Sequence, residues 1–305
     1  MTIRMKDTHL IKLLTLITTT LIVGHSSPAH AADADIVAAL KSKGAEAVET
    51  KGALTGLSFR DCTGLVEGDY QQIHQLSHLK SLSFGKGFND AALKALGAMP
   101  EVEMLTTNGM DVSDGGVGAL ATFQNLRTFS IFHPGKSLTG TGLAALVTLP
   151  HFENLTVAGS TEFGDAGMAA VATLPHLKGF RTWHSGVTVE GVKQLRSLKE
   201  LTTLTLGQRL ANTPPTTLSD AAVAVLADCA SLEALNLQEA RLTLSALSQL
   251  KKLTHLKRLT LDGIDLAEAD VNTLKQQLAP VDVRWTAPND AAKHRIDALF
   301  KVPAQ

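Results

Sequence analysis

The chain has 305 residues, of which 44% are hydrophobic, and this is enough apolar side chain to bury a core of ordinary size. A formal net charge of −1 excludes the diffuse basic field that non-specific nucleic-acid binding needs, and two cysteines exclude both a disulfide-stapled scaffold and a multi-cysteine zinc site. Leucine is in excess, at 47 positions, whereas the aromatic residues are Phe 10, Trp 2 and Tyr 1, which indicates a repetitive core built from one side chain.

Residues 1–31 are predicted to be a cleaved signal peptide. Basic residues precede or interrupt an apolar run over 10–23, and small residues then lead to the A-x-A cleavage pattern of 29–31. The run is about 14 residues long and contains Lys12, so an uncleaved membrane anchor is the less favoured alternative. Because no second apolar run of about 18 residues follows, we expect a mature chain without a membrane span, located in the periplasm or secreted.

Residues 32–53 are predicted to form an N-terminal cap. A short helix is expected over 34–43, ended by Gly44, and an edge strand over 45–49 would cover the structure that follows. Polar-faced caps of this kind keep a repetitive array soluble.

Residues 54–285 contain an internal repeat of about nine units with a terminal strand, and the units are about 25 residues long. Each unit reads L-x-x-L-x-L and continues with a variable loop and a short segment of helical apolar spacing. The unit openings and the start of the last strand are Leu54, Leu79, Val102, Leu126, Phe152, Leu177, Leu201, Leu232, Leu256 and Val281. The alternation in the first half predicts a strand with one buried face, and the second half predicts a short helix.

A lone strand and a lone short helix cannot bury their apolar faces, so the units must stack. Stacking predicts an α/β solenoid with a parallel β-sheet on the concave face and short helices on the convex face, coiled right-handedly. The strand alternation places Leu204 in the core and Thr205 in solvent. Residues 286–305 are predicted to be a C-terminal capping helix, over 289–300, and a tail.

The sequence resembles leucine-rich repeat proteins of the exported bacterial type, over roughly residues 54–285. The helix entries at 89–93, 164–168 and 219–223 are similar to the T-D-A-G-L variant of that family. The resemblance implies a ribonuclease-inhibitor-like horseshoe that binds other proteins. The asparagine or cysteine that usually follows the strand occurs once, as Cys62, so the loops must satisfy their backbone groups by other contacts.

Polar residues also recur at fixed positions of the unit. They are Asp90, Asp114, Asp165 and Asp220 before the helical stretches, and His78, His151, His176 and His255 before the unit openings. We interpret the aspartates as helix caps rather than a calcium ladder, because the column is interrupted. We interpret the histidines as polar turn residues rather than metal ligands, because no third ligand is evident. Cys62 and Cys229 lie in the first and seventh units, too far apart for a disulfide.

Large side chains gather in the middle units, on or beside strand positions that alternate with buried leucines and that elsewhere hold small residues. The predicted partner-binding residues are Phe132, His133, Arg181, Trp183, His184 and Arg209. Aromatic and arginine side chains are enriched at the centres of protein interfaces, and the strand-to-helix loops also lengthen in these units. The alternative is that Trp183 only covers a neighbouring loop.

These features predict an exported, non-catalytic binding or scaffold protein, a monomer that recognises another protein with its concave face and needs no cofactor or metal. A glycan-binding protein of the cell envelope, with Trp183 and Phe132 as stacking platforms, is an alternative. An enzyme is less favoured, because it would need a carboxylate beside His133 or His184, and no acidic residue occupies the adjacent strand positions.

Overall fold

The structure is a computed structural model that describes residues 28–209 and 214–300. Within them, eleven strands form one sheet in the order β1 to β11, so strands that are neighbours in sequence are neighbours in space. The strands are β1 (Ala45–Thr50), β2 (Ala53–Asp61), β3 (Ser81–Lys86), β4 (Met104–Asn108), β5 (Thr128–Phe132), β6 (Asn154–Ala158), β7 (Gly179–Trp183), β8 (Thr203–Gly207), β9 (Ala234–Gln238), β10 (Arg258–Asp262) and β11 (Asp282–Thr286). The predicted signal peptide lies outside the described residues up to position 27, as does the predicted tail from 301.

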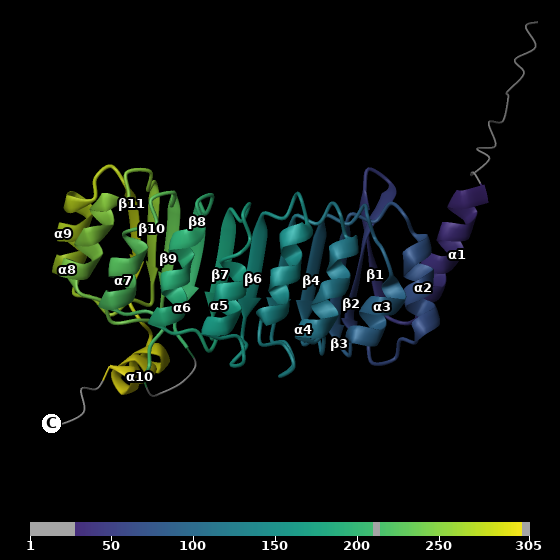
Figure 1. Cartoon of the computed structure of the whole chain (residues 1–305), viewed down its shortest axis with the longest axis horizontal. Helices are drawn as coiled ribbons and strands as arrows, with labels where there is room; N and C mark the ends of the chain where they lie inside the picture. Colours follow the sequence, from purple (N-terminus) through teal and green to yellow (C-terminus); the bar gives the residue numbers. More distant parts are fainter. Residues whose placement is uncertain (1–27, 210–213, 301–305) are drawn as a thin grey trace, which may run out of the picture.

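Helix α1 precedes the first strand, and short α-helices and 3₁₀ helices (η) follow the later strands. They are α1 (Pro28–Ser42), α2 (Glu67–Gln75), α3 (Asp90–Leu96), α4 (Asp114–Val117), η1 (Gly118–Thr122), η2 (Thr141–Thr148), α5 (Asp165–Val171), α6 (Val189–Lys193), η3 (Gln194–Ser197), α7 (Asp220–Leu226), α8 (Leu244–Leu247), η4 (Ser248–Lys252), α9 (Glu268–Gln277) and α10 (Asp290–Leu299). Figure 1 shows α2–α9 as one layer along the sheet, with the middle helices in front of the strands and α8 and α9 to the left of β11. Helix α10 lies apart from that layer, below the strand ends. We call the sheet face opposite this helix layer the open face.

The parallel strands β2–β11 are in strict register from unit to unit. Leu259 of β10, for example, lies opposite both Leu235 of β9 and Val283 of β11. Among the strands of the described residues, β1 alone runs antiparallel, against β2. A long parallel sheet whose strands alternate with one layer of short helices around a leucine core is an α/β leucine-rich repeat solenoid, as the sequence predicts.

The core lies between the sheet and the helix layer and repeats the same strand positions in every unit. Leu204 of β8 is fully buried there, between Phe180 and Leu235 in register. The prediction that Thr205 faces solvent is wrong, because its side chain lies on the open face but is only 6% exposed. The longer side chains of Arg181 and Asn236 flank it in register and limit its contact with water.

The first elements close one end of the solenoid. Helix α1 begins at Pro28, so it crosses the predicted cleavage point, and one ion pair and one hydrogen bond tie this end to the first unit. Lys43 Nζ lies 2.6 Å from Asp69 Oδ1, and His78 Nε2 lies 2.9 Å from Asp33 Oδ2. None of the helices in residues 28–209 and 214–300 is both long and apolar enough to cross a membrane.

The recurring aspartates join neighbouring units, which corrects the predicted capping role. Asp114, the first residue of α4, accepts hydrogen bonds from the N–H and hydroxyl of Thr139 and from the N–H groups of Gly140 and Gly142, all in the next unit. Burial alone would raise the pKa of the Asp114 carboxyl, but these hydrogen bonds outweigh it and lower the pKa. The same cross-unit pattern joins Asp90 to Ser113, Asp165 to Thr188, and Asp220 to Thr243. These bonds fix loops in which no asparagine ladder follows the strands.

Candidate functional site

Phe132 and Trp183 form an aromatic pair on the open face. They occupy equivalent positions of β5 and β7, with Ala158 of β6 between them in register. Their ring centroids are 6.2 Å apart and their planes are inclined by 54°. Because two strand spacings amount to about 10 Å, the rings must lean toward each other above Ala158, which is 2% exposed. The small residue on the middle strand therefore allows the pair to form.

Arg181 extends this pair on the Trp183 side. It lies two residues before Trp183 on β7, so both side chains share the open face. The guanidinium carbon of Arg181 stands over the indole ring, 5.5 Å from its centroid, in a cation–π contact. On the other side, a Cβ added at Gly207 of β8 would lie 2.4 Å from the Trp183 Cβ, so only glycine fits beside this tryptophan. We call Phe132, Arg181 and Trp183 the aromatic patch.

His133 and His184 follow the strands that carry the aromatic pair, and both have a left-handed backbone. Their φ angles are 47° and 50°, whereas the equivalent residues of two neighbouring units are Gly109 and Gly159, with φ of 78° and 70°. A non-glycine residue in this region costs about 1–3 kcal/mol, and such strain concentrates at functional sites. His133 is exposed, and its Nδ1 lies 3.2 Å from Asn108 Oδ1.

His184 belongs to a charged cluster that includes the C-terminal helix. Its Nε2 lies 3.4 Å from Oε2 of Glu239, which follows β9, and Arg295 of α10 donates to the other carboxylate oxygen at 3.0 Å. The hydrogen bond with His184 and that from Arg295 lower the pKa of Glu239 to about 2, against the opposing effect of burial. The strand positions adjacent to His184 hold no acidic residue, but Glu239 reaches its ring from two strands away.

Glu239 reaches His184 across an intervening strand. The equivalent residue after β8 is Gln208, which is 2% exposed because its side chain turns into the following loop. There the Gln208 side-chain oxygen accepts a hydrogen bond from the Thr217 N–H at 2.8 Å, and its NH2 group donates one to the Leu218 carbonyl at 2.9 Å. This inward turn leaves the space between His184 and Glu239 open, and neither Glu239 nor Arg295 is among the residues predicted from the sequence.

Arg209 is held within its own loop. Its Nη1 donates to the Pro215 carbonyl at 2.9 Å, and its main-chain N–H donates to the Gln208 side chain at 3.3 Å. Among the described residues, no hydrogen bond, ion pair or cation–π contact joins Arg209 to the aromatic patch or to the two histidines. The structure thus brings together Phe132, Arg181 and Trp183, sets the histidines at the ends of the same strands, and leaves Arg209 as a loop residue.

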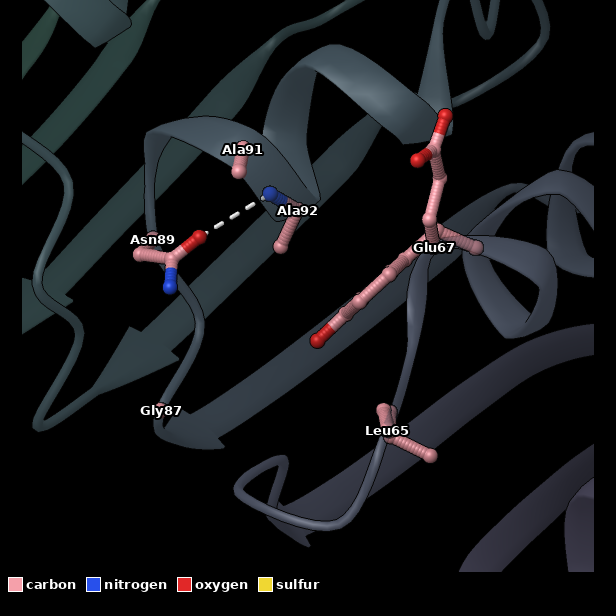
Figure 2. Close-up of a pocket in the computed structure, with 7 residues that line it drawn as sticks. Leu65, Glu67, Gly87, Asn89, Ala91 and Ala92 are labelled. Carbon is pink, nitrogen blue, oxygen red and sulfur yellow. Dashed lines mark hydrogen bonds between the residues drawn. The ribbon is translucent and has the colours of Figure 1, made fainter.

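A cavity of about 180 Å³ is lined by residues of the first two units (Figure 2). Its lining residues are Leu65, Glu67, Tyr70, Gly87, Asn89, Ala91 and Ala92. The aromatic patch lies on β5 and β7, further along the sheet. Figure 2 shows the Asn89 amide oxygen turned to the Ala92 N–H, a 3.0 Å bond that caps α3. Burial raises the pKa of the Tyr70 phenol, which therefore stays neutral. The polar groups of this wall thus serve the local fold.

The thiols and the metal-ligating side chains complete the chemical inventory. Cys62 and Cys229 are both buried and unpaired, and burial raises the pKa of the Cys229 thiol to about 11. In the part of the chain that the structure describes, no group of three or more His, Cys, Asp or Glu side chains is arranged to hold a metal ion. These thiols are protonated at neutral pH, since thiolates form only near or above the thiol pKa.

Among the solved structures that are similar to this chain are two bacterial proteins. One is an internalin (inlF) from Listeria monocytogenes, 18% identical with a TM-score of 0.46, in which 72% of this chain covers 64% of that chain. The other is a protein from Bacteroides fragilis, 14% identical with a TM-score of 0.47, in which 70% of this chain covers 68% of that one. The chain thus spans less than two thirds of the internalin. No protein-family model and no curated protein sequence matches it.

Proposed function

We propose that this leucine-rich repeat protein is a non-catalytic binding module that recognises another protein through the open face of its sheet, which we take to be the concave face. The observation that carries the proposal is the aromatic patch. Trp183 contacts both Phe132 and Arg181 on a face whose neighbouring positions hold small residues such as Ser130 and Thr156. Clustered aromatic and arginine side chains supply most of the binding energy in many protein interfaces.

The geometry of Trp183 favours a protein partner over a glycan. A sugar ring that stacks on an aromatic side chain needs one uncovered, flat ring face. Arg181 stands over the Trp183 ring, and Phe132 lies beside it at an inclination of 54°. The three side chains therefore present an uneven apolar and cationic surface, which fits interdigitating side chains better than a flat sugar. Because they already hold one another in place, less side-chain freedom is lost on binding.

The surroundings of His184 support a binding role rather than catalysis. Its imidazole contacts Glu239, as a catalytic histidine often contacts a carboxylate. Among the described residues, however, no serine, threonine or cysteine side chain forms a hydrogen bond with this ring. The pair serves instead to hold α10 against the strand ends through Arg295.

A comparative capture experiment tests the proposed function. Residues 32–305 are used as bait in the envelope fraction and the culture medium of the producing organism, alongside a Trp183→Ala/Arg181→Ala double variant. Ser81→Ala and Thr260→Ala, on the same face but outside the patch, are the matched controls. We expect proteins captured by wild type and controls to be lost with the double variant, since each substitution should weaken binding by about 1–2 kcal/mol or more. Equal capture by all variants, with unchanged thermal unfolding, would refute the proposal.

Export is part of the proposed function and has its own test. The predicted signal peptide supports a location in the periplasm or outside the cell. Mass spectrometry of the exported protein should then find an N-terminus at or within a few residues of Ala32. A full-length chain retained in the membrane would contradict both the cleavage and the location.

A further inference from the structure

We infer that the partner presents an acidic segment, in which a carboxylate pairs with Arg181 while a neighbouring apolar side chain packs on Phe132 and Trp183. This inference rests on the proposed function and specifies the chemistry of the segment that the aromatic patch recognises.

The first support is the way this protein neutralises its arginines. Nine arginines lie in the described residues, and seven of them have a carboxylate oxygen within 4.0 Å. These seven are Arg60, Arg127, Arg196, Arg241, Arg258, Arg284 and Arg295. The two without such a partner among the described residues are Arg181 and Arg209, both predicted from the sequence to bind a partner. Arg209 instead donates to a main-chain carbonyl, which leaves Arg181 as the exposed arginine without an intramolecular acceptor in this part of the chain.

A second arginine on the same face shows what Arg181 lacks. Arg284 of β11 occupies the position equivalent to Arg181 of β7, and it is also exposed. Its guanidinium lies 2.8 Å from Asp282 Oδ2, two residues earlier on the same strand. The residue two before Arg181 is Gly179, and its neighbours in register are Thr156 and Thr205. No acidic side chain therefore adjoins Arg181 along its strand or across it.

The contact with Trp183 leaves Arg181 able to bind a carboxylate. A guanidinium is planar, and its five N–H donors point outward in that plane, whereas a cation–π contact uses its flat face. Stacking on the indole therefore holds the group at the surface without consuming its donors. A carboxylate approaching the edge of the plane can accept two parallel hydrogen bonds, the geometry in which arginine binds carboxylates most strongly.

The charge distribution around the patch does not repel such a segment. The acidic residue that contacts His184 at the strand ends is Glu239, and its two carboxylate oxygens are already bonded to His184 and Arg295. The apolar part of the segment has the aromatic pair as its surface, with Ala158 beneath. These features together fit two neighbouring side chains of the partner, one acidic and the other aliphatic or aromatic.

Selection from random peptides displayed on phage tests the inference directly. The immobilised targets are the wild-type chain (residues 32–305), Arg181→Gln, Arg181→Glu and the matched control Arg284→Gln, each first checked for unchanged thermal unfolding. We expect wild type and Arg284→Gln to enrich peptides with Asp or Glu beside an apolar residue. Arg181→Gln should bind the same synthetic peptides about tenfold or more weakly, and Arg181→Glu should select Lys and Arg instead.

Two results would overturn the inference. One is a wild-type selection without acidic enrichment, or without any enriched peptide. The other is equal affinity of wild type and Arg181→Gln for the selected peptides. A Trp183→Ala variant separates these failures from failure of the proposed function. If the selected peptides depend on Trp183 but not on Arg181, the aromatic patch still binds proteins and only the acidic chemistry is wrong.

Discussion

The two faces of the same strands follow different rules. On the buried face, neighbouring units repeat nearly the same side chain, as Leu155, Phe180 and Leu204 do in consecutive strands. On the open face, the next residues of those strands are Thr156, Arg181 and Thr205, so a long charged side chain stands between two small neutral ones. In a solenoid each unit packs only on its neighbours, so the repeated face determines stability along the whole array. The open face is then available for recognition without much cost to the fold.

Substitutions on the two faces should differ most in their effect on stability. Leu204→Asp places a charge without a partner in the core, next to Phe180 and Leu235, and we expect the free energy of unfolding to fall by about 3–5 kcal/mol. Thr260→Asp, on the open face of β10, should change it by less than about 0.5 kcal/mol. Urea denaturation measures both. Similar losses at the two positions would mean that the faces are not distinguished as described.

Thr260 is a better control than Thr205 for this comparison. Both lie on the open face at equivalent strand positions, but Thr205 is 6% exposed, whereas Thr260 is partly exposed. A charge at position 205 would be partly desolvated. Its effect on the free energy of unfolding would therefore include a burial penalty that an exposed open-face position does not have.

Substitutions of the cross-unit aspartates should have the next largest effect on stability, because these residues bond the strand-to-helix loop of one unit to that of the next. Asp114 accepts four hydrogen bonds from the next unit, whereas Asp220 accepts two from Thr243. We expect Asp114→Ala to lower the free energy of unfolding by about 3 kcal/mol and Asp220→Ala by about half as much, since each removal leaves loop donors unsatisfied. Chemical denaturation of both variants checks the order. A cost that is equal, or larger for Asp220, would show that these bonds do not determine loop stability.

Glu239 is a charge at the strand ends that should contribute to stability, and its effect depends on pH. Its pKa is about 2 in the folded protein, below the ordinary value of 4.5, so the folded state binds the proton more weakly than the unfolded state. Its contribution is therefore complete above about pH 5 and is lost as the pH falls toward 2. We expect Glu239→Gln to cost about 2 kcal/mol at neutral pH and little at pH 2. A cost that does not change with pH would exclude this electrostatic origin.

Much of the fold is readable from the sequence because the buried face is repetitive. The leucine spacing predicts the strands and their parallel stacking, since a one-residue shift would expose every core side chain. The contact between Phe132 and Trp183 also leaves a readable trace, because both occupy the same strand position with the small Ala158 between them. That pattern of two aromatic residues around a small one is the signal from which the pair could be found.

Other contacts cannot be read this way because they depend on side-chain reach between distant segments. Glu239 meets His184 only because Gln208 turns inward, and Arg295 joins them only because α10 lies at the strand ends. The aspartate column indicates a structural role, but the choice between the aspartate's own helix and the next unit depends on loop geometry. Asp114 bonds Thr139 in the next unit, which no periodicity in the sequence specifies.

The smallest expected effect on stability comes from His133, whose backbone is strained directly after β5. His133 has φ of 47°, and its side chain contacts Asn108, which is exposed with it, so glycine should fit the backbone at little energetic loss. Replacing histidine with glycine elsewhere costs about 0.5–1 kcal/mol through the entropy of the unfolded chain. At position 133 the relief of the left-handed conformation offsets this cost, so we expect His133→Gly to leave the free energy of unfolding within about 0.5 kcal/mol of wild type. His151→Gly, at an exposed turn without a positive φ, is the matched control and should show the full cost. If both variants lose the same amount in urea denaturation, His133 stores no strain, and its conformation gives no support to a functional role for the histidines beside the aromatic patch.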